Sequence, residues 1–269
     1  MITIELPEQT RQNYQAALEA LNHAGIPYVV GGAYALFHYT GLLRSTYDLD
    51  VCVTPPQVDA TLRVLGGAGF STWVEEAHWL AKAQRGADLV DVISGFGNWL
   101  APIDETWLTR AEAGTVLGVP VRLAPVEEFI WSKAYVAARE RYDGADIVHL
   151  INAAHDRIDW DHLLQRFAPH WELLLSHLLV YRFVYPSERD KVPPRVIEQL
   201  VEKLREQQRQ PPPAERLCRG TLLDRRSFNL DVLKFGFVDP REQLAVARGY
   251  SPADVSRYRT WIQKERAAQ

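Results

Sequence analysis

The chain has 269 residues, of which 47% are hydrophobic and 24% charged, the composition of a globular protein with a sizeable core. Its 30 basic and 34 acidic residues give a formal net charge of −4, which argues against a protein that coats nucleic acid, so no bulk DNA binding is expected. No stretch approaches the roughly 20 apolar residues of a membrane span, and charges stand where a secretion signal needs an apolar run. With only two cysteines, Cys52 and Cys218, we expect a cytoplasmic protein without a membrane partner.

The first elements in chain order are a helix, a short strand and a second helix. Apolar residues recur at helical spacing over residues 8–24, and a glycine and a proline then end the pattern. Residues 28–30 form a short apolar run that leads into Gly31 and Gly32, and the small and apolar residues of 33–39 restart a helix. The pattern therefore predicts a strand, a glycine turn and a helix in immediate succession.

Alternating apolar residues then predict the rest of a sheet. Residues 48–53 alternate apolar side chains with Asp and Cys, the pattern of a strand with one buried face. Residues 54–65 begin with threonine and two prolines, which favour a helix start. Short apolar runs between turn residues in 69–100 predict a meander of strands, and residues 116–121 predict a tight hairpin around a glycine.

From about residue 125 onward the pattern becomes helical. We predict helices at about 126–141, 144–154, 159–167, 170–184 and 194–209, and a last helix that starts at Ser251. The proline triplet at 211–213 is the best candidate for a linker. The sequence thus predicts an α+β fold, with a mixed β-sheet flanked by helices in residues 1–124 and a mainly helical region in residues 125–269.

Asp48 and Asp50 are the first candidates for a site with chemistry. They lie two residues apart on a predicted strand, so both carboxylates project from the same face, about 7 Å apart along the chain. Two carboxylates placed in this way can share hard divalent cations, which phosphoryl and nucleotidyl transfer require. Taken alone, the pair is more often a solvated strand face, so its context decides between the two interpretations.

The glycine pair supplies part of that context. Gly31 and Gly32 follow directly on an apolar strand, where backbone N–H groups without side chains can approach phosphate oxygens closely. An isolated glycine pair is most often an ordinary turn. Together with Asp48 and Asp50, however, the pair is far more specific than either feature alone.

Asp88 and Asp91 offer the third carboxylate that a two-metal site needs. Asp91 lies inside an apolar run, where a carboxylate is costly to bury without a metal or hydrogen bonds. Asp88 stands at the beginning of the run, where water can reach it. We therefore prefer Asp91 as the third metal ligand and keep Asp88 as the alternative.

The segment GGAYALFHYTGLLRSTYDLDV resembles the signature of the DNA-polymerase-β-like nucleotidyltransferase superfamily. The resemblance covers roughly residues 10–155, and the most similar groups are bacterial nucleotidyltransferase family proteins, AbiEii-type toxins and aminoglycoside and lincosamide nucleotidyltransferases. It implies a nucleotidyltransferase catalytic domain in residues 1–124 and a helical region in residues 125–269 that completes the nucleotide and acceptor cleft. The sequence departs from the signature at Gly32, where many members carry serine, which removes one phosphate contact but keeps the backbone cradle.

The resemblance also implies which residues bind the substrates. Asp48, Asp50 and Asp91 would bind Mg²⁺ or Mn²⁺, and Gly31 and Gly32 would touch the triphosphate of the donor NTP, with ATP the expected donor. The acceptor would carry a hydroxyl group, and its identity as a small molecule, a tRNA or a protein stays open.

Arg44 and Thr46 precede the two aspartates and are candidates for phosphate binding. Arg44 could neutralise triphosphate charge through two parallel hydrogen bonds, which lysine would do less well. Thr46 could hydrogen-bond either a phosphate or an aspartate. For both residues, a plain surface-loop role is an open alternative.

Lys133 belongs to a helical segment that resembles the superfamily's, in which a lysine reaches the nucleotide phosphates and a following aspartate positions the lysine or the acceptor. Carried over to this chain, the lysine is Lys133 and the aspartate is Asp143 or Asp146. The alternative is an exposed helix with ion pairs in which Asp143 caps the next helix, and for Asp143 we prefer that alternative.

Two classes of function follow. The first is a metal-dependent nucleotidyltransferase in which an acceptor hydroxyl attacks the α-phosphate of an NTP and pyrophosphate leaves. The second is a catalytically silent nucleotide- or partner-binding module of the same fold, for example a toxin–antitoxin component. Because all three acidic positions are filled, the sequence favours the enzyme.

Overall fold

Seven strands form one mixed sheet in the computed structural model, which describes residues 6–42, 46 and 48–255. They are β1 (Val29–Val30), β2 (Asp48–Cys52), β3 (Ser71–Glu76), β4 (Leu80–Arg85), β5 (Asp88–Ile93), β6 (Glu112–Val116) and β7 (Val119–Leu123). The strand order is β3-β4-β5-β2-β1-β7-β6. The pairs β2–β5 and β1–β7 are parallel, and the other neighbours are antiparallel.

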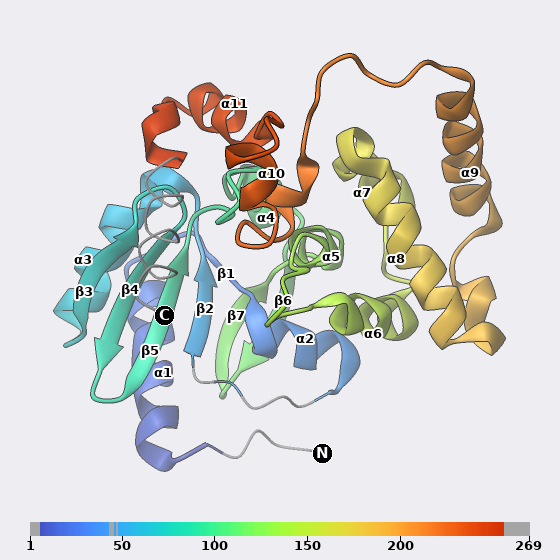
Figure 1. The fold of residues 1–269 in the computed structure, drawn as a ribbon. Helices are drawn as coiled ribbons and strands as arrows, with labels where there is room; N and C mark the ends of the chain where they lie inside the picture. Colours follow the sequence, from blue (N-terminus) through green and yellow to red (C-terminus); the bar gives the residue numbers. More distant parts are fainter. Residues whose placement is uncertain (1–5, 43–45, 47, 256–269) are drawn as a thin grey trace. The chain divides into compact units, whose positions relative to one another are not determined.

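Helices precede and separate the strands, and the regular elements described after β7 are all helical (Figure 1). They are α1 (Glu8–His23), α2 (Gly32–Thr40), α3 (Val58–Gly67), α4 (Glu105–Thr109), α5 (Val126–Ala134), α6 (Gly144–Ala154), α7 (Trp160–Arg166), α8 (Trp171–Val184), α9 (Pro194–Arg209), α10 (Asn229–Leu233) and α11 (Pro240–Ala247). Short 3-10 turns lie at Pro55–Gln57, Ala168–His170, Pro186–Lys191 and Arg219–Leu222. The predicted α+β fold is confirmed.

The chain divides into two compact units. The first consists of Met1–Gly97, Pro102–Ile130 and His149–Leu163 and holds the whole sheet, whereas the second consists of Asn98–Ala101, Trp131–Val148 and Leu164–Gln269 and is helical. The domain boundary at residue 124 stays a prediction. No helix among the residues described is both long and apolar enough to cross a membrane.

The two faces of the sheet differ in polarity where β2, β5 and β4 lie side by side. Alternate residues on these strands are buried and apolar, and α1 and α3 pack along the sheet (Figure 1). The buried set is Leu49, Val51, Ala81, Ala83, Val90 and Val92. Because side chains alternate between the faces of a strand, the intervening positions Asp48, Asp50, Asp91 and Lys82 project from the opposite face. The apolar face thus anchors the strands that carry the acidic residues.

One predicted helix is shorter than expected, because α5 ends at Ala134 and does not continue to residue 141. The chain turns back instead: Val136 N donates to Lys133 O, Ala137 bridges to Tyr142, and Asp143 N donates to Val136 O. Residues 135–141 favour a helix by composition. The ion pairs of Asp143 with Lys133, at the end of α5, and with Arg141 oppose that local preference, so side-chain contacts decide where the helix ends.

Candidate active site

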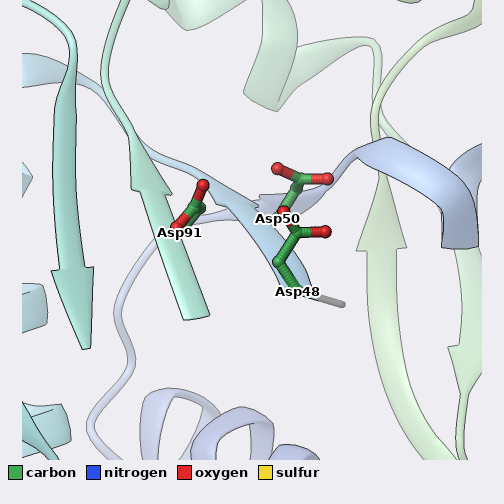
Figure 2. Close-up of side chains that lie close together, drawn as sticks. All are labelled: Asp48, Asp50 and Asp91. Carbon is green, nitrogen blue, oxygen red and sulfur yellow. The ribbon is translucent and has the colours of Figure 1, made fainter. Parts of the chain in front are cut away.

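Three carboxylates meet on the polar face of the sheet. Asp48 and Asp50 lie on β2, and Asp91 lies on the neighbouring strand β5 directly opposite Asp50. Figure 2 shows the three side chains on the same side of the two strands. One carboxylate oxygen from each residue lies within 4.8 Å of the others, and all three residues are partly buried. The parallel register of β2 and β5 therefore joins residues that are 41 positions apart in the sequence.

Gly32 lies against this acidic group. Its φ of +54° is in the left-handed region, which favours glycine. A Cβ atom at this position would stand 2.7 Å from Cγ of Asp50 and would overlap its Oδ2 atom. The close approach of the backbone to the Asp50 carboxylate thus explains why this position holds glycine.

Gly31 connects the turn to the strand that carries the aspartates. Its N–H donates to the backbone oxygen of Asp50 over 3.0 Å, so this amide is already used within the sheet. The first turn of α2 closes with Ala35 N–H donating to Gly31 O, so the amides of residues 32–34 lie at the helix start, where no intrahelical acceptor precedes them. Helix starts of this kind favour anions.

Thr46 contacts one of the aspartates. Its hydroxyl donates to Oδ1 of Asp48 over 2.8 Å, and Asp48 O lies 3.1 Å from the same hydroxyl. Of the two roles predicted for Thr46, the structure describes the one in which it bonds an aspartate. Arg44, the other candidate in this segment, lies outside the residues described.

The sequence interpretation missed Lys82, which contacts the third aspartate. Lys82 lies on β4 directly opposite Asp91, and its Nζ atom is 2.8 Å from Asp91 Oδ1. The two side chains are 20% and 15% exposed, so the contact is largely shielded from water. Burial raises the pKa of the Asp91 carboxyl above its usual value, and the hydrogen bond from Lys82 acts in the opposite direction. No sequence signal marked Lys82, because its importance depends on the register of two strands.

Asp88, the alternative third ligand, has a different environment. Its Oδ1 accepts from the Thr10 hydroxyl over 2.8 Å, and its Oδ2 accepts from Asn13 Nδ2 over 2.6 Å. Both partners lie on α1. Asp88 is therefore tied to α1, whereas Asp91 joins Asp48 and Asp50, the arrangement that we preferred from the sequence.

Lys133 lies in the second unit with two carboxylates of that unit. Its Nζ atom is 2.9 Å from Asp143 Oδ2 and 2.8 Å from Asp146 Oδ2. The Lys133 side chain is 11% exposed, and those of Asp143 and Asp146 are 9% and 4% exposed. Although burial acts to raise it, the hydrogen bonds and charges of Arg141 and Lys133 hold the pKa of Asp143 below its usual value. The contact of Lys133 with a nucleotide stays a prediction.

The three converging carboxylates suit a hard divalent cation. All three donors are oxygen atoms, which Mg²⁺ and Mn²⁺ prefer, and one oxygen from each residue can face a shared point. Like charges held this close repel one another, so a cation between them would relieve an unfavourable interaction. The donor set therefore fits the metal that nucleotidyl transfer requires.

A known protein family matches more than half of the chain. The profile of a family described as "Uncharacterised nucleotidyltransferase" matches residues 8–183. No curated protein matches the sequence.

Solved structures that match include a nucleotidyltransferase-like antigen from Paracoccidioides brasiliensis, with 18% identity, coverage of 69% of this chain and 94% of that chain, and a TM-score of 0.43. The antibiotic-resistance factor ANT(2'')-Ia matches with 18% identity, 76% and 95% coverage, and a TM-score of 0.41. The lincosamide antibiotic adenylyltransferase LnuA matches with 13% identity, 52% and 94% coverage, and a TM-score of 0.38.

Proposed function

The chain belongs to this nucleotidyltransferase family, and we propose that it transfers a nucleoside monophosphate from an NTP to a hydroxyl acceptor. In this reaction the acceptor oxygen forms a bond to the α-phosphorus and loses its proton. The bond between the α-phosphorus and the bridging oxygen breaks, and pyrophosphate leaves. We propose ATP as the donor and Mg²⁺ or Mn²⁺ as the cofactor.

The observation that carries this proposal is the convergence of Asp48, Asp50 and Asp91 within 4.8 Å beside a glycine turn. The three carboxylates would hold the cation, which would neutralise triphosphate charge and make the acceptor hydroxyl easier to deprotonate. Thr46 would restrain Asp48 through the hydrogen bond to its carboxylate. A cluster of like charges that costs stability in the free protein is typical of a site that awaits a cation.

The glycine turn has two roles in the proposed site. Gly32 leaves room for the Asp50 carboxylate, which a side chain would displace. The amides at the start of α2 offer hydrogen-bond donors to phosphate oxygens, an interaction that the positive end of a helix favours. We assign the phosphate contact to these amides and not to Gly31 N–H, because that amide already donates to Asp50 O.

The test is a transfer assay with each of the four α-labelled NTPs and Mg²⁺. The labelled nucleotide is incubated with the protein alone, with total tRNA, and with separated small-molecule and protein fractions of a cell lysate. We expect label on one of these acceptor classes and loss of labelling in Asp50→Ala. The acceptor fraction that takes the label identifies the class of substrate.

The catalytically silent module is the alternative that the same assay decides. Label transfer at the wild-type rate by Asp50→Ala would refute the proposed role of the acidic group. An NTP and Mg²⁺ that bind to the protein without labelling any acceptor would favour the silent module.

We also propose that the protein works in the cytoplasm, without a membrane partner and without bulk DNA binding. Both cysteines, Cys52 and Cys218, are free, which suits a reducing compartment. Fractionation of cells that produce the full chain with a small tag tests this location.

A further inference from the structure

A row of paired residues crosses three strands of the sheet at the acidic group. Asp50 on β2 pairs with Asp91 on β5, and Asp91 pairs with Lys82 on β4. Directly paired residues on neighbouring strands project from the same face of a sheet. Asp91 therefore stands between an aspartate on one side and a lysine on the other.

The contact between Lys82 and Asp91 engages one carboxylate oxygen. Lys82 Nζ lies 2.8 Å from Asp91 Oδ1, a distance typical of a charge-assisted hydrogen bond. Both residues are held by an antiparallel ladder that runs from Leu80↔Ile93 to Arg85↔Asp88, so their Cα atoms keep a fixed separation. The bond thereby restricts rotation of the Asp91 carboxylate, which has two oxygens but only one in contact with the lysine.

We propose that Lys82 is a positioning residue for Asp91, which holds one carboxylate oxygen and so directs Asp91 toward a divalent cation shared with Asp48 and Asp50. This inference rests on the proposed function, because it assigns a role to Lys82 within the same site. Lys82 acts through Asp91 and not on the nucleotide. Partners that orient a metal ligand typically contribute about 10- to 100-fold to metal affinity or activity.

Lys82 could instead only offset the negative charge of the site, and the two roles predict opposite effects of its removal on cation binding. If Lys82 only offset negative charge, its removal would make the site more negative and would tighten the binding of a divalent cation. If Lys82 orients Asp91, its removal frees the carboxylate to rotate and weakens the binding. The sign of the change therefore separates the two roles, and it can be measured without any substrate.

The experiment measures Mn²⁺ binding to the full chain by isothermal titration calorimetry in the absence of nucleotide. Lys82→Met keeps the apolar stem but removes the charge and the donor. We expect it to weaken Mn²⁺ binding about tenfold or more. Lys82→Arg keeps a charged donor and is expected to bind Mn²⁺ more tightly than Lys82→Met.

Gln84→Met is the matched control, because Gln84 lies on the same strand and the same face as Lys82 but bonds to Gly86 O. It should bind Mn²⁺ like the wild type. Thermal unfolding without cation verifies that each variant folds. In the transfer assay at saturating Mg²⁺, Lys82→Met should lower kcat about tenfold and leave the KM for the NTP nearly unchanged.

The positioning role is overturned if Lys82→Met binds Mn²⁺ as tightly as the wild type or more tightly. It is also overturned if Lys82→Met and Lys82→Arg lose the same amount of Mn²⁺ affinity. The failure of the proposed function has a different signature. If the wild type binds an NTP and Mg²⁺ but labels no acceptor, the proposed function fails, and if Asp50→Ala transfers label at the wild-type rate, the role of the acidic group fails, whatever Lys82 does. If Asp50→Ala is inactive while Lys82→Met binds Mn²⁺ normally, only the role of Lys82 fails.

Discussion

Two clusters of charged residues in the chain are built on opposite principles. In the first unit, the carboxylates of Asp48, Asp50 and Asp91 converge on one another. In the second unit, the carboxylates of Asp143 and Asp146 converge on the ammonium group of Lys133. The first arrangement gathers three carboxylates, of which Asp91 also contacts Lys82, whereas the second places one lysine in contact with two carboxylates.

The difference indicates what each cluster contributes. Oppositely charged partners in a buried site stabilise one another, and the loss of either partner leaves an uncompensated charge. The three carboxylates of the first unit repel one another, and a divalent cation bound between them would reduce a repulsion that the single contact of Asp91 with Lys82 only partly offsets. We therefore interpret the cluster of the second unit as support for the fold and that of the first unit as a site kept for a ligand.

The largest expected effect on stability is that of Lys133→Met. The substitution removes the ammonium group that contacts two largely buried carboxylates. Loss of one partner from a buried ion pair typically lowers the free energy of unfolding by about 3–5 kcal/mol. Urea unfolding of the wild type and the variant measures the change. Lys191→Met is the control, because Lys191 forms a more exposed ion pair with Glu188 and its loss should cost less than about 1 kcal/mol.

The same variant decides between a structural role and the predicted nucleotide contact of Lys133. Unchanged unfolding together with a raised KM for the NTP would contradict the structural role and favour the nucleotide contact. The dependence of the unfolding free energy on pH is a second test of the structural role. Because the pKa of Asp143 is lowered in the folded chain, its contribution to stability is full at neutral pH and is lost as the pH falls through that lowered pKa.

A smaller effect is expected for Gly32→Ala in the first unit. The left-handed backbone costs a non-glycine residue about 1–2 kcal/mol, and the overlap with the Asp50 carboxylate adds to this cost. The variant should also lower transfer activity, because Asp50 must move. Urea unfolding and the transfer assay together measure both effects.

Gly25→Ala separates the two causes. Gly25 has a φ of +65°, and among the residues that the structure describes, its chain neighbours aside, none has an atom within 4 Å of a Cβ at this position, so its substitution carries only the backbone cost. It should destabilise the chain less than Gly32→Ala and leave transfer unchanged. Equal effects of the two substitutions on activity would contradict the close contact between Gly32 and Asp50.

The smallest expected effect comes from the cation itself. A ligand that binds only the folded chain, supplied at ten times its Kd, adds about 1.4 kcal/mol of stability. Mg²⁺ or Mn²⁺ should therefore raise the Tm of the wild type in differential scanning calorimetry. The same addition should leave the Tm of Asp50→Ala nearly unchanged, and an equal rise in both proteins would argue against the acidic group as the binding site.

The sequence was sufficient to predict the elements that carry the acidic group. The alternation in residues 48–53 and the glycine pair after an apolar run predicted β2 and the turn into α2, and the structure contains both. The burial argument preferred Asp91 to Asp88, and the structure places Asp91 with Asp48 and Asp50. These features depend on local patterns or on a polar group inside an apolar run, so they can be predicted from the sequence.

Features that depend on the exact register of neighbouring strands or on the fold of a turn could not be predicted. Lys82 contacts Asp91 because of the register between β4 and β5, which local patterns do not determine. The end of α5 at Ala134 depends on Lys133, Arg141 and Asp143, whose contacts oppose the local helix preference. In both cases, the side-chain contacts follow from the three-dimensional path of the chain, which composition and spacing do not determine.

The most direct test of the acidic group compares Asp91→Asn with Asp88→Asn in the transfer assay. Both changes remove one carboxylate charge from β5, but Asp88 bonds Thr10 and Asn13 on α1, whereas Asp91 joins Asp48 and Asp50. We predict that Asp91→Asn lowers label transfer about a hundredfold or more, while Asp88→Asn keeps most of the activity. Equal activity of the two variants, or a greater loss in Asp88→Asn, would contradict the assignment of Asp48, Asp50 and Asp91 as the site of transfer.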